Sequence, residues 1–154
     1  MPPDPAPLPT TLVEAFKATT YRVRLTGGAE VDVRVGERVD WPAGEQGRGP
    51  AGHWMIVTPD NPGARSRDED ANRRQRAELD AALAEARIPV RGTTRHIDPR
   101  GRWPDEHGRL VEVRRLEEGL ALARRFGQAA VVCGTGNGPA ELVPLPRDSA
   151  SDAG

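Results

Sequence analysis

A short stretch of this chain concentrates side chains that can bind a metal ion or transfer a proton. His96, Asp98 and Glu106 supply one imidazole and two carboxylates, and a further acid and a further histidine flank Glu106. Nitrogen and oxygen donors of this kind can hold a divalent cation that activates water, and Glu106 could then act as a ligand or as the base. Ordinary polar residues of a surface loop would have the same composition.

Polar side chains also gather in residues 58–72. Asn61 stands before a proline, where its side chain can either close a turn or contact a ligand. Asn72 continues the apolar stripe of a predicted helix toward the start of that helix. An amide that faces inward needs a partner from the protein, from water or from a ligand, so Asn72 is a candidate binding residue.

Two features that suggest phosphate binding have simpler explanations. The sequence G-T-G-N-G at 134–138 leads into Pro139 and a strand-like segment, whereas a phosphate loop leads into a helix. It therefore predicts a hairpin turn. Arg65 lies near the start of a predicted helix, where an anion could bind, but the acids from Asp68 to Asp70 already occupy that positive end.

The charge and composition of the chain disfavour a nucleic-acid-binding role. The 154 residues carry 22 basic and 23 acidic side chains, interspersed along the chain, for a net charge of -1. Aromatic residues make up 4% of the chain, which leaves few rings for stacking on bases. A nucleic-acid partner is therefore not expected, because such proteins usually present a basic face.

The cysteine content and the hydropathy pattern indicate in which compartment of the cell the protein is located. The single cysteine, Cys133, excludes an internal disulfide and fits a small buried position. No run of about 18 apolar residues occurs, and the N-terminus lacks the basic and apolar regions of a secretion signal. A cytoplasmic protein with no membrane association is expected.

Hydrophobic periodicity divides the chain into elements. Residues 1–10, rich in proline, and residues 146–154 are expected to be disordered tails, and residues 11–145 to form one domain. Residues 41–52 are a glycine-rich connection. The predicted strands, from period-two alternation or short apolar runs, are 21–25, 31–35, 54–58, 89–95, 109–114, 128–133 and 141–143.

Three helices are predicted from capping patterns and helical periodicity. Capping boxes at Thr11–Glu14 and at Ser66–Glu69 would start a short helix and a long helix that reaches about Arg87. The third helix covers about 116–126, with acids early and arginines late, as the helix dipole favours.

The first two strands should form a hairpin around Gly27 and Gly28. A two-residue loop would mix polar and apolar side chains on one face. A three-residue loop at 27–29 instead pairs Leu25 with Val31 and sets Arg24 opposite Asp32, and this register is the prediction.

From Trp54 onward the predicted elements alternate as β-α-β-β-α-β, the arrangement of the ferredoxin-like sandwich. The fold class is therefore predicted to be α+β, ferredoxin-like, with an added N-terminal hairpin and a C-terminal strand. Right-handed crossovers would bring the end of the first strand, the start of the long helix, the loop at 96–108 and the residue before the last crossover strand to one rim. The candidate ligand-binding residues at this rim are Thr58, Asn61, Arg65, Asn72, His96, Asp98, Trp103, Glu106 and Gln128.

A family resemblance rests on several residues at matching spacings. They are Thr58, Asn61, Pro62, Ser66, Asn72, Asp98, Trp103, Glu106 and Phe126-Gly127-Gln128. Through them the chain resembles, over about residues 20–143, a bacterial family catalogued as a domain of unknown function, the DUF3293 family. This chain differs at Pro59-Asp60, where a small residue and an aromatic are common in the family, and at His107. The resemblance implies a bacterial origin and a shared site, and it brings no assigned activity.

The leading hypothesis is a domain that binds a small polar or nucleotide-like ligand in a pocket at this rim. The sequence identifies neither a reaction nor a cofactor. One alternative is a metal-dependent hydrolase or nuclease that uses residues 96–107. The other is a protein-interaction module without chemistry, which would present a sheet edge or the 41–52 connection to a partner.

Overall fold

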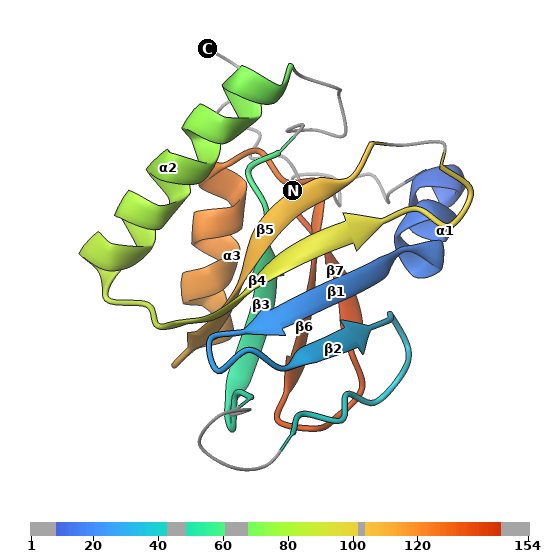
Figure 1. The fold of residues 1–154 in the computed structure, drawn as a ribbon, viewed down its shortest axis with the longest axis horizontal. Coiled ribbons are helices and arrows are strands. Elements are labelled where there is room, and N and C mark those ends of the chain that lie inside the picture. Colours follow the sequence, from blue (N-terminus) through green and yellow to red (C-terminus); the bar gives the residue numbers. More distant parts are fainter. Residues whose placement is uncertain (1–8, 43–48, 61–67, 102–103, 146–154) are drawn as a thin grey trace, which may run out of the picture.

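The computed structural model of the chain describes residues 9–42, 49–60, 68–101 and 104–145. Within these residues one seven-stranded sheet carries three helices (Figure 1). Of the predicted tails 1–10 and 146–154, residues 1–8 and 146–154 lie outside the described residues, and Thr10 is the first residue of a helix. In chain order the elements are α1 (Thr10–Ala18), β1 (Thr20–Leu25), β2 (Glu30–Val33), β3 (His53–Val57), α2 (Glu69–Ala86), β4 (Val90–Ile97), β5 (Glu106–Val113), α3 (Leu116–Arg125), β6 (Ala130–Thr135) and β7 (Glu141–Pro144).

The strand order is β2-β1-β4-β5-β3-β6-β7, and each neighbouring pair is antiparallel. From β3 to β6 the chain runs β-α-β-β-α-β, which is the element order expected from the sequence. The hairpin β1–β2 extends the sheet beside β4, and β7 extends it beside β6. The fold is α+β, as predicted.

One face of the sheet packs against α2 and α3, which lie side by side on it (Figure 1). Side chains alternate between the two faces of a strand, so Met55 and Val57 reach the helices while their neighbours point the other way. Leu79 and Leu83 of α2 meet them, and Leu122 of α3 joins the same cluster. Each such fully buried side chain contributes roughly 1.5–3 kcal/mol.

The opposite face buries a second apolar cluster, which includes Leu25, Trp54 and Leu110. Curling of the sheet covers part of this face. Val35, just after β2, forms a bridge with Ala140, just before β7, and a second bridge joins the same two segments. The two edges of the sheet therefore approach each other at these segments.

Two tryptophans pack together in the apolar cluster inside the curled sheet. The rings of Trp41 and Trp54 meet edge to face at a centroid distance of 5.5 Å and an interplanar angle of 88°. Both Nε1 groups donate to the carbonyl oxygen of Gly136, at 2.8 and 3.0 Å. The G-T-G-N-G segment is thus a hairpin turn between β6 and β7, as predicted, and it also supplies the acceptor for both rings. Trp41 belongs to the 41–52 connection, of which residues 43–48 lie outside the described part.

The predicted register of the first hairpin is wrong by two residues. The pairs are Tyr21 with Val33, Val23 with Val31 and Arg24 with Glu30, so the three-residue loop is 26–28 and not 27–29. The physical reason is the backbone of Gly28, whose φ of 99° is the positive value that the last residue of such a loop adopts. A loop at 27–29 would have required alanine in that conformation. The two faces of the hairpin are nevertheless assigned correctly, because a shift of two residues preserves them.

Both predicted capping boxes are also wrong. In α1 the N-cap is Pro9, whose carbonyl accepts the N–H groups of Leu12 and Val13 at 3.0 Å, and no side chain caps the helix. In α2 the N-cap is Asp68, whose carboxylate accepts from the N–H of Ala71 at 2.8 Å. Aspartate caps a helix as well as serine does, and Asp68 stands directly before the helical run.

The predicted 96–108 loop is shorter than expected. β4 continues to Ile97 and β5 begins at Glu106, so residues 96–97 and 106–108 lie in strands. None of the helices in the described part of the chain is long and apolar enough to cross a membrane.

Gly92 lies at an irregularity of β4, where the pairing with β5 shifts between Val90 and Gly92. A methyl group at this position would lie 2.5 Å from the carbonyl oxygen of Arg24 in β1. A glycine is therefore required for β1 and β4 to approach each other at the bend.

Replacing Gly92 by alanine should lower the free energy of unfolding by roughly 1–3 kcal/mol, because the backbone of β1 must move. Gly52→Ala is the matched control, since a methyl group there would meet nothing closer than a carboxylate oxygen at 3.4 Å. Urea unfolding of both variants measures the difference. Equal stability of the two variants would contradict the close approach.

Candidate functional site

A cavity of about 110 Å³ lies between α1 and the face of the sheet that carries Tyr21 and Ile56. It is located at the end of the sheet where β3 and β4 finish and where β5 and β6 begin. In the described part of the chain, six helices and strands and four connections contribute to it. The lining residues are Leu12, Ala15, Phe16, Thr19, Tyr21, Ile56, Thr58, Asp60, His96, Asp98, Pro104, Glu106, Gln128, Ala129, Ala130, Val131 and Val132.

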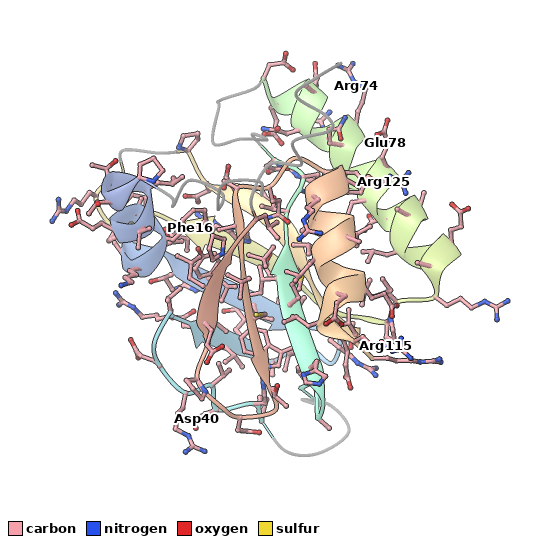
Figure 2. The ribbon with its side chains drawn as sticks, turned by 180° about the vertical axis from the view of Figure 1, so that it is seen from behind. Phe16, Asp40, Arg74, Glu78, Arg115 and Arg125 are labelled. Carbon is pink, nitrogen blue, oxygen red and sulfur yellow. The ribbon has the colours of Figure 1, made fainter. Side chains whose placement is uncertain are left out.

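Helix α1 forms one wall of the cavity. Leu12, Ala15, Phe16 and Thr19 recur at helical spacing, so they share one face of the helix. Figure 2 shows Phe16 on the side of α1 that faces the strands. No residue of α1 is fully buried, which means that the helix covers the cavity while remaining partly exposed itself.

Tyr21, His96 and Glu106 form a row across three strands on the opposite wall. Tyr21 of β1 pairs with His96 of β4, and His96 pairs with Glu106 of β5. The rings of Tyr21 and His96 meet edge to face, with centroids 4.8 Å apart. Thr94 lies two residues before His96 on the same face, and its Oγ1 is 2.9 Å from Nε2 of the imidazole. The imidazole is thus held on two sides.

Both rings of this row are uncharged at neutral pH. The pKa of His96 is lowered to about 3, mainly by burial and secondly by the nearby imidazole of His107, while Asp105 acts in the opposite sense. Burial also raises the pKa of Tyr21 above its usual value, and the carboxylate of Glu106 adds to that effect, while a hydrogen bond with Thr19 opposes it. A neutral imidazole and a neutral phenol therefore face the cavity beside the carboxylate of Glu106.

A buried ion pair anchors the edge of the cavity. The side chain of Asp60 is 1% exposed, and its Oδ1 accepts from Nε of Arg76 at 2.8 Å. Its Oδ2 accepts from Nη2 of the same guanidinium and, at 2.9 Å, from the backbone N–H of His107. Arg76 also donates to Glu69 at 2.9 Å. The hydrogen bond with Asp60 raises the pKa of Arg76. One carboxylate therefore joins the segment after β3, the start of β5 and helix α2.

Thr58 and Gln128 connect the strand ends around the same edge. The hydroxyl of Thr58 donates to the carbonyl of His107 at 2.6 Å and accepts from the N–H of Asp60 at 3.1 Å. The side-chain carbonyl of Gln128 accepts from the N–H of Thr58 at 3.2 Å. These bonds hold β3, β5 and the start of β6 in place, so both side chains have a positioning role in the fold.

Five of the nine predicted site residues line the cavity together. They are Thr58, His96, Asp98, Glu106 and Gln128. Asn72 is buried on α2, as an inward-facing amide should be, but it does not line the cavity, and it interacts within the chain. The remaining three, Asn61, Arg65 and Trp103, lie outside the described residues.

Sequence reasoning missed the α1 wall, Tyr21 and Asp60. The spacing of Leu12 and Phe16 indicated a helix laid on the core, but it did not say where the helix would pack. Tyr21 has the alternation of an ordinary core residue of β1. Asp60 is the clearest available signal, because it stands where an aromatic is common in the family that the chain resembles, and a buried aspartate requires a partner of opposite charge.

The charge of the described lining limits its chemistry. Asp60, Asp98 and Glu106 are acidic, and no lysine or arginine is among the residues that line the cavity in the described part of the chain. Those residues also contain no group of three or more histidine, cysteine, aspartate or glutamate side chains placed to hold a metal ion. The arrangement is suited to accepting hydrogen bonds from a small molecule beside an apolar wall.

Residues 57–131 match the model of one protein family, described as a protein of unknown function (DUF3293). The match confirms the resemblance found in the sequence, and it spans β3 to the first residues of β6, with most of the polar lining of the cavity. No curated protein and no solved structure matches the chain significantly.

Replacing Asp60 by asparagine should lower the free energy of unfolding by roughly 3–5 kcal/mol, because Arg76 would be left with one partly exposed partner. Asp80→Asn is the matched control. Asp80 also accepts two bonds from one arginine, Arg109, but its side chain is 49% exposed, so the loss should be about 1 kcal/mol or less. Chemical unfolding of both variants tests the difference, and similar losses would show that the buried pair is not an anchor.

The neutral state of His96 makes stability depend on pH. Below its unfolded pKa of about 6.5 the unfolded chain takes up a proton that the folded protein excludes until about pH 3. Stability should therefore fall by up to about 1.4 kcal/mol per pH unit as the pH drops through this window, in addition to the effect of the carboxylates. In His96→Gln this part of the slope should disappear, whereas His53→Gln, at an exposed position, should keep it. The measurement is the free energy of unfolding at several pH values between 3 and 7. If His96→Gln has the same slope as the wild-type protein, the imidazole is not kept neutral in the folded state.

Proposed function

We propose that this domain, which matches a family without an assigned activity, binds a small polar molecule in the cavity between α1 and the sheet. The observation that carries the proposal is the composition of the lining. Leu12, Phe16, Ile56 and Val132 supply an apolar wall, and the carboxylates, Tyr21 and His96 converge on one rim. A mostly apolar concave site with a few convergent polar groups is the usual form of a small-molecule site.

The size of the cavity sets the size of the molecule. Ligand pockets for drug-sized compounds usually enclose roughly 300–1,000 Å³. A cavity of about 150 Å³ accommodates benzene. The volume here, about 110 Å³, therefore suits one compact group, either a small molecule or the part of a larger one that enters first. The nucleotide-like ligand considered from the sequence finds no phosphate partner in the described lining, because that lining lacks lysine and arginine.

The two alternatives drawn from the sequence have less support. A metal-dependent hydrolase would use His96 as a ligand, yet the imidazole is buried and already contacts Thr94 through Nε2. An interaction module would present an apolar patch or an open sheet edge. Among the described residues, Val90 is the large hydrophobic side chain that is exposed, and bridges join the segments next to the two edge strands.

We also propose that the fold is of the ferredoxin-like type. The order β6-β3-β5-β4, with α2 and α3 on one face, supports placing these strands among ferredoxin-like sandwiches.

We further propose that the protein is located in a bacterial cytoplasm. The thiol of Cys133 is buried and unpaired with another cysteine, which fits a reducing compartment better than an oxidising one.

A thermal-shift screen of compact metabolites tests the binding proposal. At least one compound should raise the melting temperature, and at 100 times its Kd it should add about 2.7 kcal/mol of stability. Ala15→Phe, which places a ring in the cavity, should abolish this stabilisation. Ala18→Phe, on the same helix but outside the lining, should preserve it.

The proposal fails if no compound in the screen stabilises the wild-type protein, or if a stabilising compound acts equally on Ala15→Phe. The melting temperatures of both variants without ligand show whether α1 still folds onto the sheet.

A further inference from the structure

The buried imidazole of His96 determines which chemical group the cavity can recognise, on the premise that the proposed binding function holds. His96 lines the cavity and is 8% exposed. Because its pKa is lowered to about 3, mainly by burial, the ring is neutral at neutral pH. A neutral imidazole has one N–H, which donates, and one bare nitrogen, which accepts. The hydrogen bond made by one nitrogen decides the state of the other.

The hydroxyl of Thr94 is the group that decides this for His96. Its Oγ1 lies 2.9 Å from Nε2 of the imidazole, and Thr94 is 3% exposed. Within the described residues this hydroxyl has no second hydrogen-bond partner. If Nε2 carried the proton, the hydroxyl oxygen would accept that N–H, and the hydroxyl hydrogen would be buried without an acceptor, which is costly. If the hydroxyl donates to a bare Nε2, both groups are satisfied, and the proton of the imidazole lies on Nδ1.

The second nitrogen of the ring, Nδ1, is the one that is open to the cavity. It has no hydrogen-bond partner in the described part of the chain, where the other contact of the ring is its edge-to-face packing with Tyr21. Among the same residues, no fully buried side-chain nitrogen or oxygen lacks a partner. Nδ1 is therefore not enclosed by protein atoms, and the open space beside His96 is the cavity.

We infer that Nδ1–H of His96 donates a hydrogen bond to the ligand, and that the ligand is a compact molecule with a neutral acceptor, such as a carbonyl oxygen. A neutral ring offers no charge to an anion, so burying a carboxylate against it would be costly. The apolar body of the ligand packs against Leu12, Phe16 and Val132. Nδ1–H adds a donor to a lining whose carboxylates accept hydrogen bonds. Thr94 is a positioning residue, since it acts through the ring.

Nitrogen-15 NMR of the full chain tests the position of the proton without a ligand. Long-range proton–nitrogen spectra at neutral pH distinguish a protonated ring nitrogen from a bare one. The chain has three histidines, so the resonances of His96 are those that remain when His53 and His107 are replaced by glutamine. The proton should lie on Nδ1. In Thr94→Val the resonance of the bare Nε2 should move, because it loses its donor. Thr94→Ser keeps the hydroxyl and should restore it, and Thr93→Val, at an exposed position, should leave it unchanged.

Three five-membered rings of nearly equal size test which group the ligand must present. Cyclopentanone accepts a hydrogen bond, pyrrole donates one, and methylenecyclopentane does neither. Titrations followed by NMR chemical shifts should show that cyclopentanone binds about tenfold more tightly than pyrrole, with shifts at His96 and in α1. In His96→Phe, which keeps an aromatic ring and removes Nδ1, the affinity for cyclopentanone should fall about tenfold relative to that for methylenecyclopentane.

The possible failures are distinguishable. A proton on Nε2 in the wild-type protein would overturn the inference whether or not His96→Phe folds, and it would leave the binding function untouched. The inference is also wrong if pyrrole binds as well as cyclopentanone, or if a folded His96→Phe has the same relative affinities as the wild-type protein. If none of the three probes binds while the metabolite screen finds a stabilising compound, the inference is wrong and the binding function stands. If the screen is negative as well, both are wrong.

Discussion

The sheet of this protein must bury apolar side chains on both of its faces, and the rest of the molecule follows from that requirement. Two helices lie on one face, which is the usual solution for an α+β fold. The other face has no helical layer of its own size, so the sheet curls until its two edges approach each other. Trp41 and Trp54 fill the interior of the curl at one end and share one carbonyl acceptor. At the other end the short helix α1 is the cover, and the space between it and the strands is the cavity.

The polar rim of the cavity can exist because its charges are arranged in two layers. Asp60 sits deepest, and its burial is tolerable only with the guanidinium of Arg76 and a backbone N–H as partners. That pair connects α2 to the strand ends, so the long helix helps to define the site although it contributes no described lining residue. Closer to the cavity, His96 stays neutral through burial, and Glu106 and Asp98, which also interact within the chain, complete the polar lining.

Much of the architecture could be predicted from the sequence, because periodicity and chain direction determine it. Alternation located β1, and right-handed crossovers placed Thr58, His96, Asp98, Glu106 and Gln128 at one rim before any geometry was known. Details that depend on single residues could not be predicted: the hairpin register follows from the positive φ of Gly28, and the start of α2 follows from the cap that the side chain of Asp68 provides. The partner of Asp60 could also not be predicted, because the sequence contains many arginines and does not indicate that Arg76 is the one that pairs with it. The packing site of a nine-residue helix such as α1 is set by the space that the curled sheet leaves open.

Helix α1 is the wall of the cavity with the weakest attachment to the rest of the fold. It buries none of its residues fully, whereas the opposite wall belongs to the central sheet, where local opening costs nearly the whole free energy of folding. The two walls can therefore change independently during evolution. Substitutions at Leu12, Ala15 or Phe16 would alter the shape that the cavity accepts at little cost in stability, while the charged rim, embedded in strand pairing, would remain as it is. Under the proposed function, relatives of this domain could thus differ in the shape of the molecule that they accept and keep the same polar rim.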